Sequence, residues 1–313
     1  MISKNSYLLS FTENNHPSFL LIPFRNEDIF NNSQINTKYN FNLVKMLQDR
    51  YPDKYVTLTS SGRHALKLVL EDIMNKIKYS EVSIKTTSDK KYISSCVTDM
   101  IEKLNLRWTR KHHNSHKVSL FNHEFGYVDE SLNNRNHKNS FNIEDCAFSF
   151  DSKYNDNSLC GTKSQYAIFS LSKFFPIQIG GFLLSDTPID NKLDDPKTIR
   201  YISNVVGYYF NMIDEWSESR LILKQYYIET FGNLNIKNYF EYNSNDVPGV
   251  FLFQVGENVN LPLLKKYFWK RGVQCSVFYG ENAFFLPLNQ FTTKRHIDYY
   301  YELYLNFLEN NEA

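Results

Sequence analysis

Lys173 is the residue of this chain whose surroundings best suit covalent chemistry. It lies between an apolar stretch, residues 166–171, and the pair Gly180-Gly181, which is a poor place for an ordinary solvated charge. Desolvation lowers the pKa of a lysine amine, and the neutral amine is the form that attacks carbonyl groups. The sequence therefore predicts a reactive lysine. The alternative is a lysine that buries its stem and extends its charged end to water.

Asp145 is the second candidate, because it ends segment 141–145, which we expect to form a buried strand. A carboxylate in that position needs a partner, since an unpaired buried charge is costly. Local backbone N–H groups are one possible partner. The protonated ring nitrogen of a bound cofactor is the other.

The third candidate is the turn Ser60-Ser61-Gly62-Arg63, which follows a β-branched segment, 55–59. The apolar residues after the turn recur with helical spacing: Leu66, Val69, Leu70, Ile73 and Ile77. The start of a helix presents free backbone N–H groups and the positive end of the helix dipole, which suit a phosphate. The alternative is an ordinary helix cap with a tolerated glycine.

Taken in chain order, these three sites match the needs of one cofactor, pyridoxal 5′-phosphate (PLP). Its phosphate would bind at the helix start, and Asp145 would keep its pyridine nitrogen protonated. Lys173 would carry its aldehyde. In open α/β sheets, ligands bind beyond the carboxyl ends of the strands, which is where all three candidates are expected.

The segments around these sites resemble the DegT/DnrJ/EryC1/StrS family of sugar aminotransferases, a branch of the fold-type I PLP enzymes. Residues 61–66, 121–126 and 143–147 are similar to its Ser-Gly-Thr-Ala-Ala-Leu, His-Leu-Tyr-Gly and Ile-Glu-Asp-Cys-Ala motifs. Residues 169–181 are similar to its Phe-Ser…Lys…Gly-Gly segment. Residues 207–212 and 285–290 are similar to its Gly-Tyr-Asn-Tyr-Arg-Met and Leu-Pro-Leu-His-Gln motifs.

The resemblance implies a PLP-dependent aminotransferase that moves an amino group, from glutamate or a similar donor, to a nucleotide-linked keto-sugar for surface-polysaccharide or lipopolysaccharide synthesis. Lys173 would bind the cofactor and Asp145 would pair with the pyridinium. The lysine favours transamination, because the dehydratases of this family have histidine there. The other residues that the resemblance places at the cofactor are Ser61, Gly62, Arg63, Tyr92, His123 and Ser170. A homodimer is implied as well.

Several positions depart from the family pattern. Phe148 stands where the family has Gln or His near the cofactor, and Tyr209 and Asn211 replace an Asn and an Arg. The spacing from Phe169 to Lys173 is shorter than usual. These departures motivate an alternative, a degenerate homologue that binds a sugar nucleotide or a protein partner without transamination. A third alternative is an unrelated phosphate-binding α/β protein in which Lys173 is structural.

Strand and helix patterns alternate through the first two thirds of the chain, which predicts an α/β fold with a mostly parallel mixed sheet. We expect a large cofactor-binding domain at 1–200, with an N-terminal segment that is short for the family. Residues 201–313 would form a long linking helix, expected at 205–231, and a small C-terminal α/β domain. Residues 1–50 are polar and predict one helix, at 42–50, and the segment 186–205 is expected to be a hinge.

The bulk composition excludes several classes of protein. A net charge of +1 and a pI near 7.6 give no support for a nucleic-acid or acidic-membrane partner. The four cysteines form no CxxC pair, so neither a zinc site nor a disulfide framework is expected. The sequence has no signal-peptide pattern and no apolar run of about 18 residues, so we expect a cytoplasmic protein.

Overall fold

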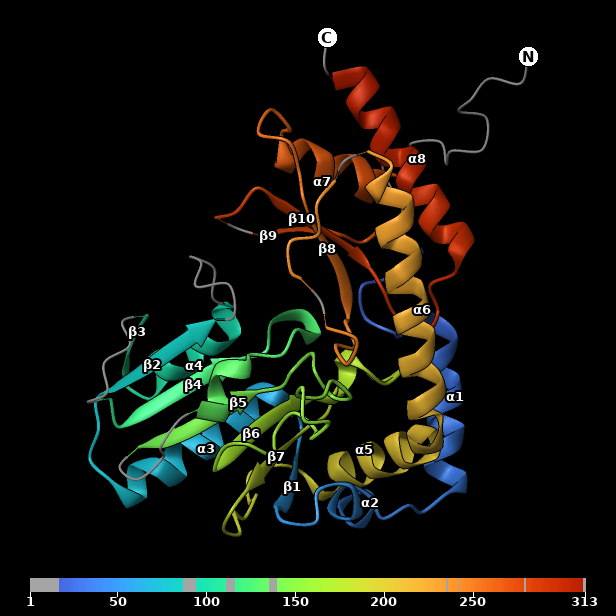
Figure 1. The fold of residues 1–313 in the computed structure, drawn as a ribbon. Coiled ribbons are helices and arrows are strands. Elements are labelled where there is room, and N and C mark those ends of the chain that lie inside the picture. Colours follow the sequence, from blue (N-terminus) through green and yellow to red (C-terminus); the bar gives the residue numbers. More distant parts are fainter. Residues whose placement is uncertain are drawn as a thin grey trace.

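A computed structural model describes residues 17–86, 94–110, 116–134, 140–234, 236–241, 243–278 and 280–311. Its larger sheet has seven strands in the order β1-β7-β6-β5-β4-β2-β3 (Figure 1). The strands are β1 (Tyr55–Thr59), β2 (Glu81–Thr86), β3 (Arg107–Thr109), β4 (Val118–Asn122), β5 (Phe141–Asp145), β6 (Tyr166–Ser170) and β7 (Gly181–Ser185). This architecture confirms the predicted α/β fold.

Strand direction decides which residues meet at the edge of this sheet. Neighbouring strands from β3 to β6 pair in parallel, whereas β7 is antiparallel to both β6 and β1. Strand β1 therefore runs in the same direction as β4, β5 and β6. The carboxyl ends of these four strands lie along one edge, and Asp145 is paired there with Asn122 and Ile168.

Helices cover both faces of the large sheet. Successive side chains of a strand point to opposite faces, so each strand contributes to both cores. Ile168 of β6 joins a core under α3 (Gly62–Lys76) and α4 (Ser95–Lys103). Its neighbours Ala167 and Phe169 join the opposite core, under α2 (Leu43–Arg50) and α5 (Pro196–Tyr209). Helix α1 (Asn26–Lys38) packs on the outside of α5 (Figure 1).

A smaller antiparallel sheet forms a second layer, with strand order β8-β10-β9. Its strands are β8 (Val250–Gln254), β9 (Ser276–Phe278) and β10 (Ala283–Pro287), and helices α7 (Leu261–Lys270) and α8 (Lys294–Asn311) pack with it. Helix α6 (Ile213–Gly232) runs from beside α5 up to this sheet, as Figure 1 shows. Its Tyr227 stacks on Phe251 of β8, with ring centroids 4.4 Å apart.

Two of our expectations about helices were wrong, and the segment expected to be a hinge contains part of a helix. Helix α1 was missed because its sequence has little apolar periodicity, and two of its three buried residues are the polar Asp28 and Asn32. The segment expected to be a hinge contains the start of α5, where the Asp195 side chain caps the helix and Pro196 occupies its first turn. The expected long helix is interrupted by the 3-10 turn η4 (Phe210–Met212).

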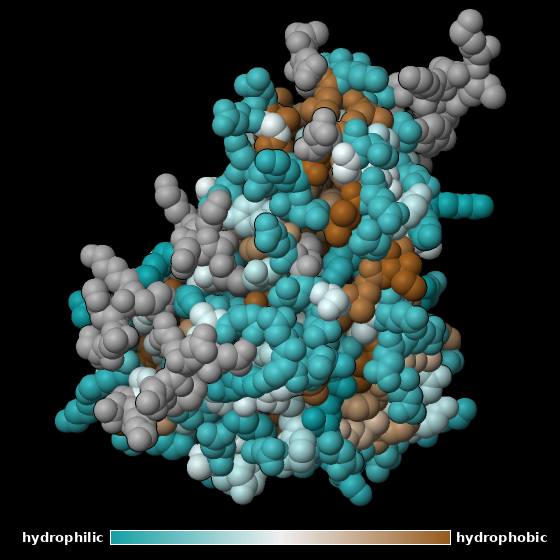
Figure 2. Space-filling view, viewed as in Figure 1, coloured by the Kyte–Doolittle hydropathy of each residue, from teal (hydrophilic) through white to brown (hydrophobic). Residues whose placement is uncertain are grey.

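The surface of the described residues is mostly hydrophilic on the face that Figure 2 presents. Apolar side chains gather on it where α1, α5 and the start of α6 lie, and exposed apolar residues of those helices and of the turn η4 include Ile29, Phe30, Tyr208 and Met212. Within the described part of the chain, every helix is too short or too polar to cross a bilayer. The division into domains at residue 200 stays a prediction.

Candidate functional site

A cavity of about 580 Å³ lies at the carboxyl edge of the large sheet. The strand ends of the large sheet and the segments that follow them supply much of its polar lining: Ser61, Gly62, Arg63, Asn122, Asp145, Ser170 and Lys173. Strands of the smaller sheet supply part of its apolar lining: Val250, Val277 and Phe285. Lysine, carboxylate and helix start, which the sequence places far apart, therefore face one space between the two sheets.

Lys173 reaches the cavity from a short 3-10 turn, η3 (Leu171–Lys173), directly after β6. The Phe174 and Phe175 N–H groups both donate to the Leu171 carbonyl, at 3.1 and 2.8 Å, and this pairing fixes the turn. The Lys173 amine lies 5.0 Å from the centre of the Phe148 ring. Burial lowers the pKa of the amine. This environment favours the neutral, nucleophilic form.

Asp145 lines the same cavity from the end of β5 and is 5% exposed. Its Oδ1 accepts the Ala147 N–H at 3.0 Å. Burial raises the pKa of this carboxyl to about 6, although the Ala147 hydrogen bond opposes the rise. A cation placed beside Asp145 would relieve this penalty, which makes the residue a suitable partner for a protonated ring nitrogen.

The start of α3 is a tight backbone cradle next to these two residues. The Ser61 hydroxyl caps the helix by accepting the His64 N–H at 3.2 Å. A Cβ atom on Gly62 would lie 3.1 Å from the Phe169 carbonyl oxygen, and one on Gly181 would lie 2.5 Å from the Gly62 nitrogen. Only glycines let the backbone pass this closely, so the first N–H groups of α3 remain at the cavity wall.

Arg63 and Ser170 complete the polar side of the cavity. The Arg63 side chain extends from the first turn of α3, where it donates to Cys96 Sγ at 2.9 Å. The Ser170 hydroxyl lies 3.4 Å from that of Ser172. A dianionic phosphate at the helix start would have backbone N–H groups, hydroxyls and a guanidinium within this lining.

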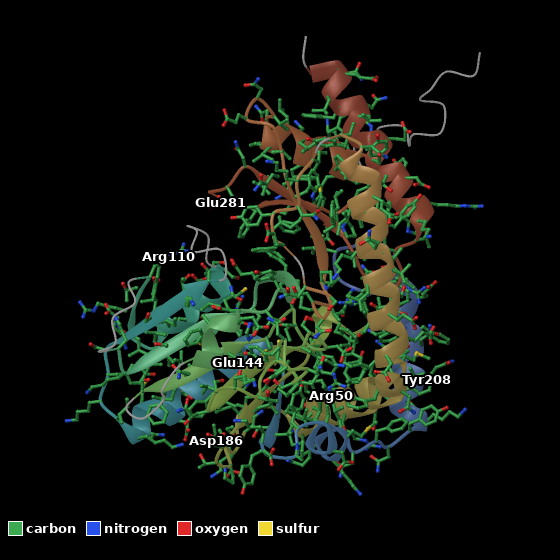
Figure 3. All side chains as sticks on the ribbon, viewed as in Figure 1. Arg50, Arg110, Glu144, Asp186, Tyr208 and Glu281 are labelled. Atoms are coloured by element: carbon green, nitrogen blue, oxygen red, sulfur yellow. The ribbon has the colours of Figure 1, made fainter. Side chains whose placement is uncertain are left out.

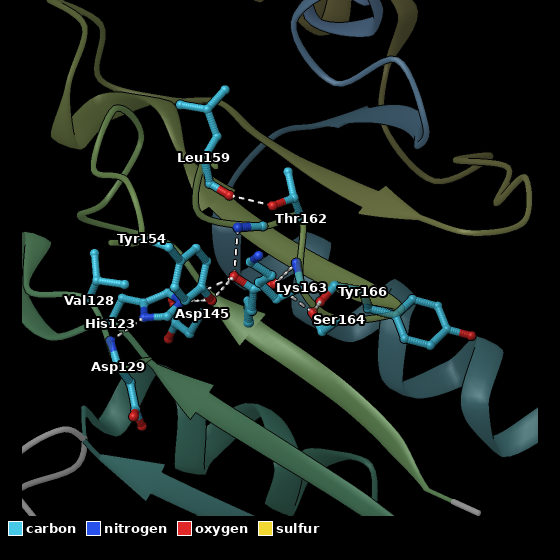
Figure 4. Close-up of polar contacts among 12 residues, drawn as sticks. His123, Val128, Asp129, Asp145, Tyr154, Leu159, Thr162, Lys163, Ser164 and Tyr166 are labelled. Carbon is cyan, nitrogen blue, oxygen red and sulfur yellow. Dashed lines mark hydrogen bonds and ion pairs between the residues drawn. The ribbon is translucent and has the colours of Figure 1, made fainter. Parts of the chain in front are cut away.

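His123 does not line the cavity; it points into a buried network beneath it (Figure 4). The Asp129 N–H donates to His123 Nδ1 at 3.0 Å, so the ring proton is on Nε2, 3.1 Å from Glu144. Its expected contact with the cofactor stays a prediction. The histidine supports the strand end that carries Asp145.

Glu144 is the centre of this network and lies in the middle of the large sheet (Figure 3). Its two oxygens accept hydrogen bonds from His123, Tyr154, Ser164 and the N–H groups of Gly161 and Lys163. Burial would raise the pKa of its carboxyl, but these donors outweigh burial and hold it below the usual range.

A metal ion could in principle use His123, Glu144 and Cys146, because their ligand atoms lie within 4.8 Å of one another. The hydrogen-bond donors already engage both carboxylate oxygens, and the histidine nitrogen that faces Glu144 carries a proton. The cluster is therefore a satisfied hydrogen-bond network that anchors the sheet.

The remaining residues that the sequence singled out are Tyr92 and the three departures from the family motifs. Tyr92 lies outside the described residues. Of the three departures from the family motifs, Phe148 lines the cavity beside Lys173, whereas Tyr209 packs on Trp216 with ring centroids 5.7 Å apart. The second departure in that motif, Asn211, is on the turn between α5 and α6.

Sequence reasoning missed the aromatic wall of the cavity. Phe125 has a positive φ of 54° and packs against both Phe148 and Phe285, with ring centroids 5.3 and 5.2 Å apart. The family resemblance placed Phe148 near the cofactor, but nothing in the sequence distinguishes Phe125 and Phe285 from the many other phenylalanines of the chain. The only local signal was the glycine after Phe125, since Gly126 also has positive φ.

No family model matches the chain, and no curated protein matches it in sequence. Solved structures do match. Helicobacter pylori PseC, an aminotransferase involved in the biosynthesis of pseudoaminic acid, superposes with a TM-score of 0.72 at 12% identity, over 93% of this chain and 99% of that one. A DegT DnrJ EryC1 StrS aminotransferase from Brucella abortus gives 0.68 at 12%, over 90% and 96%.

The GDP-4-keto-6-deoxy-D-mannose-3-dehydratase of E. coli, with bound hydrated PLP, gives a TM-score of 0.70 at 12% identity, over 92% of this chain and 100% of that one. The chain thus has the fold of fold-type I PLP-dependent transferases. Within that class, its fold is that of the sugar aminotransferases and dehydratases, as the sequence resemblance predicts.

Proposed function

We propose that this protein is a PLP-dependent aminotransferase that transfers an amino group, from glutamate or a similar donor, to a nucleotide-linked keto-sugar. One observation carries the proposal: the Lys173 amine, the Asp145 carboxylate and the glycine-lined start of α3 all line one cavity. These are the three groups that the aldehyde, ring nitrogen and phosphate of PLP require.

The residues present fit the cofactor. Ser61, Gly62, Arg63 and Ser170 would hold the phosphate, and the missing Cβ of Gly62 lets the start of α3 lie close against Phe169. Asp145 would pair with the ring nitrogen, and its raised pKa is the property that a bound cation would reverse. PLP, when bound, supplies an electron sink for the carbon that gains or loses the amino group.

The protein's own groups would supply binding, orientation and proton transfer. The Lys173 amine would hold the cofactor covalently and, once released, would move a proton between the substrate carbon and C4′ of the cofactor. The apolar rings of Phe125, Phe148 and Phe285 would exclude water from that proton transfer.

The test is an absorbance spectrum of the purified protein with added PLP. We expect the visible band of PLP bound covalently to lysine, its loss in Lys173→Ala and its retention in Lys67→Ala, a lysine on the outer face of α3. Adding glutamate should then convert the band to that of the amine form of the cofactor. A protein that stays colourless with PLP would refute the proposal.

One observation favours a second candidate, a degenerate homologue that binds a sugar nucleotide or a protein partner without chemistry. Phe148 puts an apolar ring where the family has a polar side chain, and it lies against the Lys173 amine. Transfer of an amino group to any nucleotide-linked keto-sugar would eliminate this candidate.

We also propose that the protein is a cytoplasmic homodimer and that it serves surface-polysaccharide or lipopolysaccharide synthesis. The exposed apolar side chains of Ile29, Phe30, Tyr208 and Met212 support self-association, because such groups favour burial against a partner. Sedimentation of the wild type and of Phe30→Asp tests it, with a monomeric wild type as the contrary result. The neighbour PseC supports the assignment to sugar biosynthesis.

A further inference from the structure

Arg220 is a buried charge next to the turn that carries Lys173. It belongs to α6, is 1% exposed, and burial lowers the pKa of its guanidinium to about 9. Asp151, the carboxylate that acts on it electrostatically, is itself paired with Arg50. Burying a cation without a paired carboxylate costs stability, so Arg220 is an expensive residue at this position.

The contacts of Arg220 are directed at a single stretch of backbone. Its Nη2 lies 3.4 Å from the carbonyl oxygens of Lys173 and of Phe174, and 2.9 Å from Gln290 Oε1. Gln290 Nε2 in turn donates to the Phe174 carbonyl at 3.0 Å. The guanidinium carbon lies 4.5 Å from the centre of the Phe174 ring.

These contacts hold two consecutive peptide groups at both ends. The N–H groups of Phe174 and Phe175 donate to the Leu171 carbonyl. The carbonyls of the same two peptide groups, those of Lys173 and Phe174, accept from Arg220. Neither peptide group can rotate without breaking a hydrogen bond. The direction in which the Lys173 side chain leaves the backbone is thereby fixed.

We propose that Arg220 is a positioning residue that holds the Lys173 amine in its reactive place, and that Gln290 extends this clamp to the segment after β10 of the smaller sheet. The inference rests on the proposed function only for the nature of the reaction. The clamp would tie the amine to both walls of the cavity, since Arg220 comes from α6 and Gln290 follows the smaller sheet. Arg220 itself does not line the cavity.

The first experiment needs no cofactor. Amide hydrogen exchange would be compared in the wild type, in Arg220→Met and in the control Arg271→Met. Arg271 is a matched control because its guanidinium also stacks on an aromatic ring and donates to a backbone carbonyl. We expect the amides of Phe174 and Phe175 to exchange about tenfold faster in Arg220→Met only, as loss of a charge-assisted hydrogen bond predicts.

Thermal unfolding separates positioning from a purely structural role. An apolar residue in place of a buried charge often leaves the fold as stable or makes it more stable, so we expect no loss of Tm in Arg220→Met. A uniform rise of exchange over the whole chain, together with a lower Tm, would overturn the proposal. Unchanged exchange at Phe174 and Phe175 would overturn it as well. If Arg220→Met does not fold, Gln290→Leu removes half of the clamp and should give a smaller rise at the same amides.

The second experiment measures how fast PLP becomes attached to Lys173, by borohydride reduction at timed intervals and mass spectrometry of the labelled peptide. We expect attachment about tenfold slower in Arg220→Met and partly restored in Arg220→Lys, which keeps the charge but not the fork of donors. An unchanged rate in Arg220→Met would overturn the positioning role. If the wild type takes up no PLP while the exchange result holds, the proposed function fails and the clamp on Lys173 stands.

Discussion

Replacing Asp145 by asparagine should stabilise the cofactor-free protein. Burial raises the pKa of this carboxyl from 3.8 to about 6, so above pH 6 the folded protein carries a charge that its environment disfavours. A rise of that size corresponds to roughly 3 kcal/mol, because each pKa unit is worth about 1.4 kcal/mol. Asparagine keeps the oxygen that accepts the Ala147 N–H and removes the charge.

The sign of the pH dependence follows from linkage. Below pH 3.8 the carboxyl is protonated in both the folded and the unfolded chain, and the substitution should change nothing by this route. Between pH 3.8 and about 6 the folded state binds more protons than the unfolded state, so the wild type loses stability as the pH rises. Above pH 6 the penalty is complete and constant.

The assay is thermal unfolding of the cofactor-free wild type and of Asp145→Asn at pH 4 and pH 8. A gain of roughly 3 kcal/mol corresponds to about 5 °C in Tm for a chain of this length, expected in full at pH 8 and reduced to a small fraction at pH 4. Asp194→Asn is the control with the opposite sign, because hydrogen bonds from Ser60 and Asn191 lower the pKa of Asp194 against the opposing effect of burial. It should destabilise the protein at pH 8.

A loss of stability in Asp145→Asn at pH 8 would refute the reasoning, and so would a change of equal size at both pH values. With PLP present the order should reverse. The pairing of the carboxylate with a pyridinium would be lost, and such charge-assisted hydrogen bonds contribute roughly 1.5–3 kcal/mol. The same residue would thus cost stability without the cofactor and contribute to binding with it.

Gly181→Ala should destabilise the fold by roughly 1–3 kcal/mol and weaken PLP binding, because the new methyl group would lie 2.5 Å from the Gly62 nitrogen. Denaturant unfolding checks this, with Gly232→Ala as the control: a Cβ there has nothing within 4 Å, so that variant should be as stable as the wild type or more stable. Phe148→Gln should raise the pKa of Lys173 by hydrating the amine, and should slow attachment of PLP several-fold at pH 7 while leaving the rate at pH 10 nearly unchanged. A rate lowered equally at both pH values would show that the ring acts by shape and not by desolvation.

Much of the polar side of the cavity could be predicted from the sequence. Ser61 and Lys173 follow strands and Asp145 ends one, and neighbouring parallel strands end at a common edge. The strand-turn-helix pattern around Gly62 is local, so it needs no knowledge of the tertiary fold. The prediction that these residues share a site depended on the order of secondary-structure elements, on the needs of PLP and on the family resemblance.

The rest depends on packing between distant segments. His123 lies one residue after β4, and its ring points beneath the cavity, where it bonds Glu144 and Tyr154. The alternation of side chains along the strand does not predict this direction. Phe125 follows β4 of the large sheet and Phe285 lies in β10 of the smaller sheet, so their contact joins segments that are far apart in the chain. Arg220 gave no signal either, because an arginine on an otherwise mixed helix normally faces water.

Helix α6 connects the two sheets without a break, and this continuity limits how the chain can change in length. One inserted residue within a helix turns everything beyond it by about 100° and advances it by about 1.5 Å. Insertion between Arg220 and Tyr227 would therefore swing Tyr227 away from Phe251 or pull the guanidinium from its carbonyls. The number of residues along this helix is therefore fixed by these two contacts.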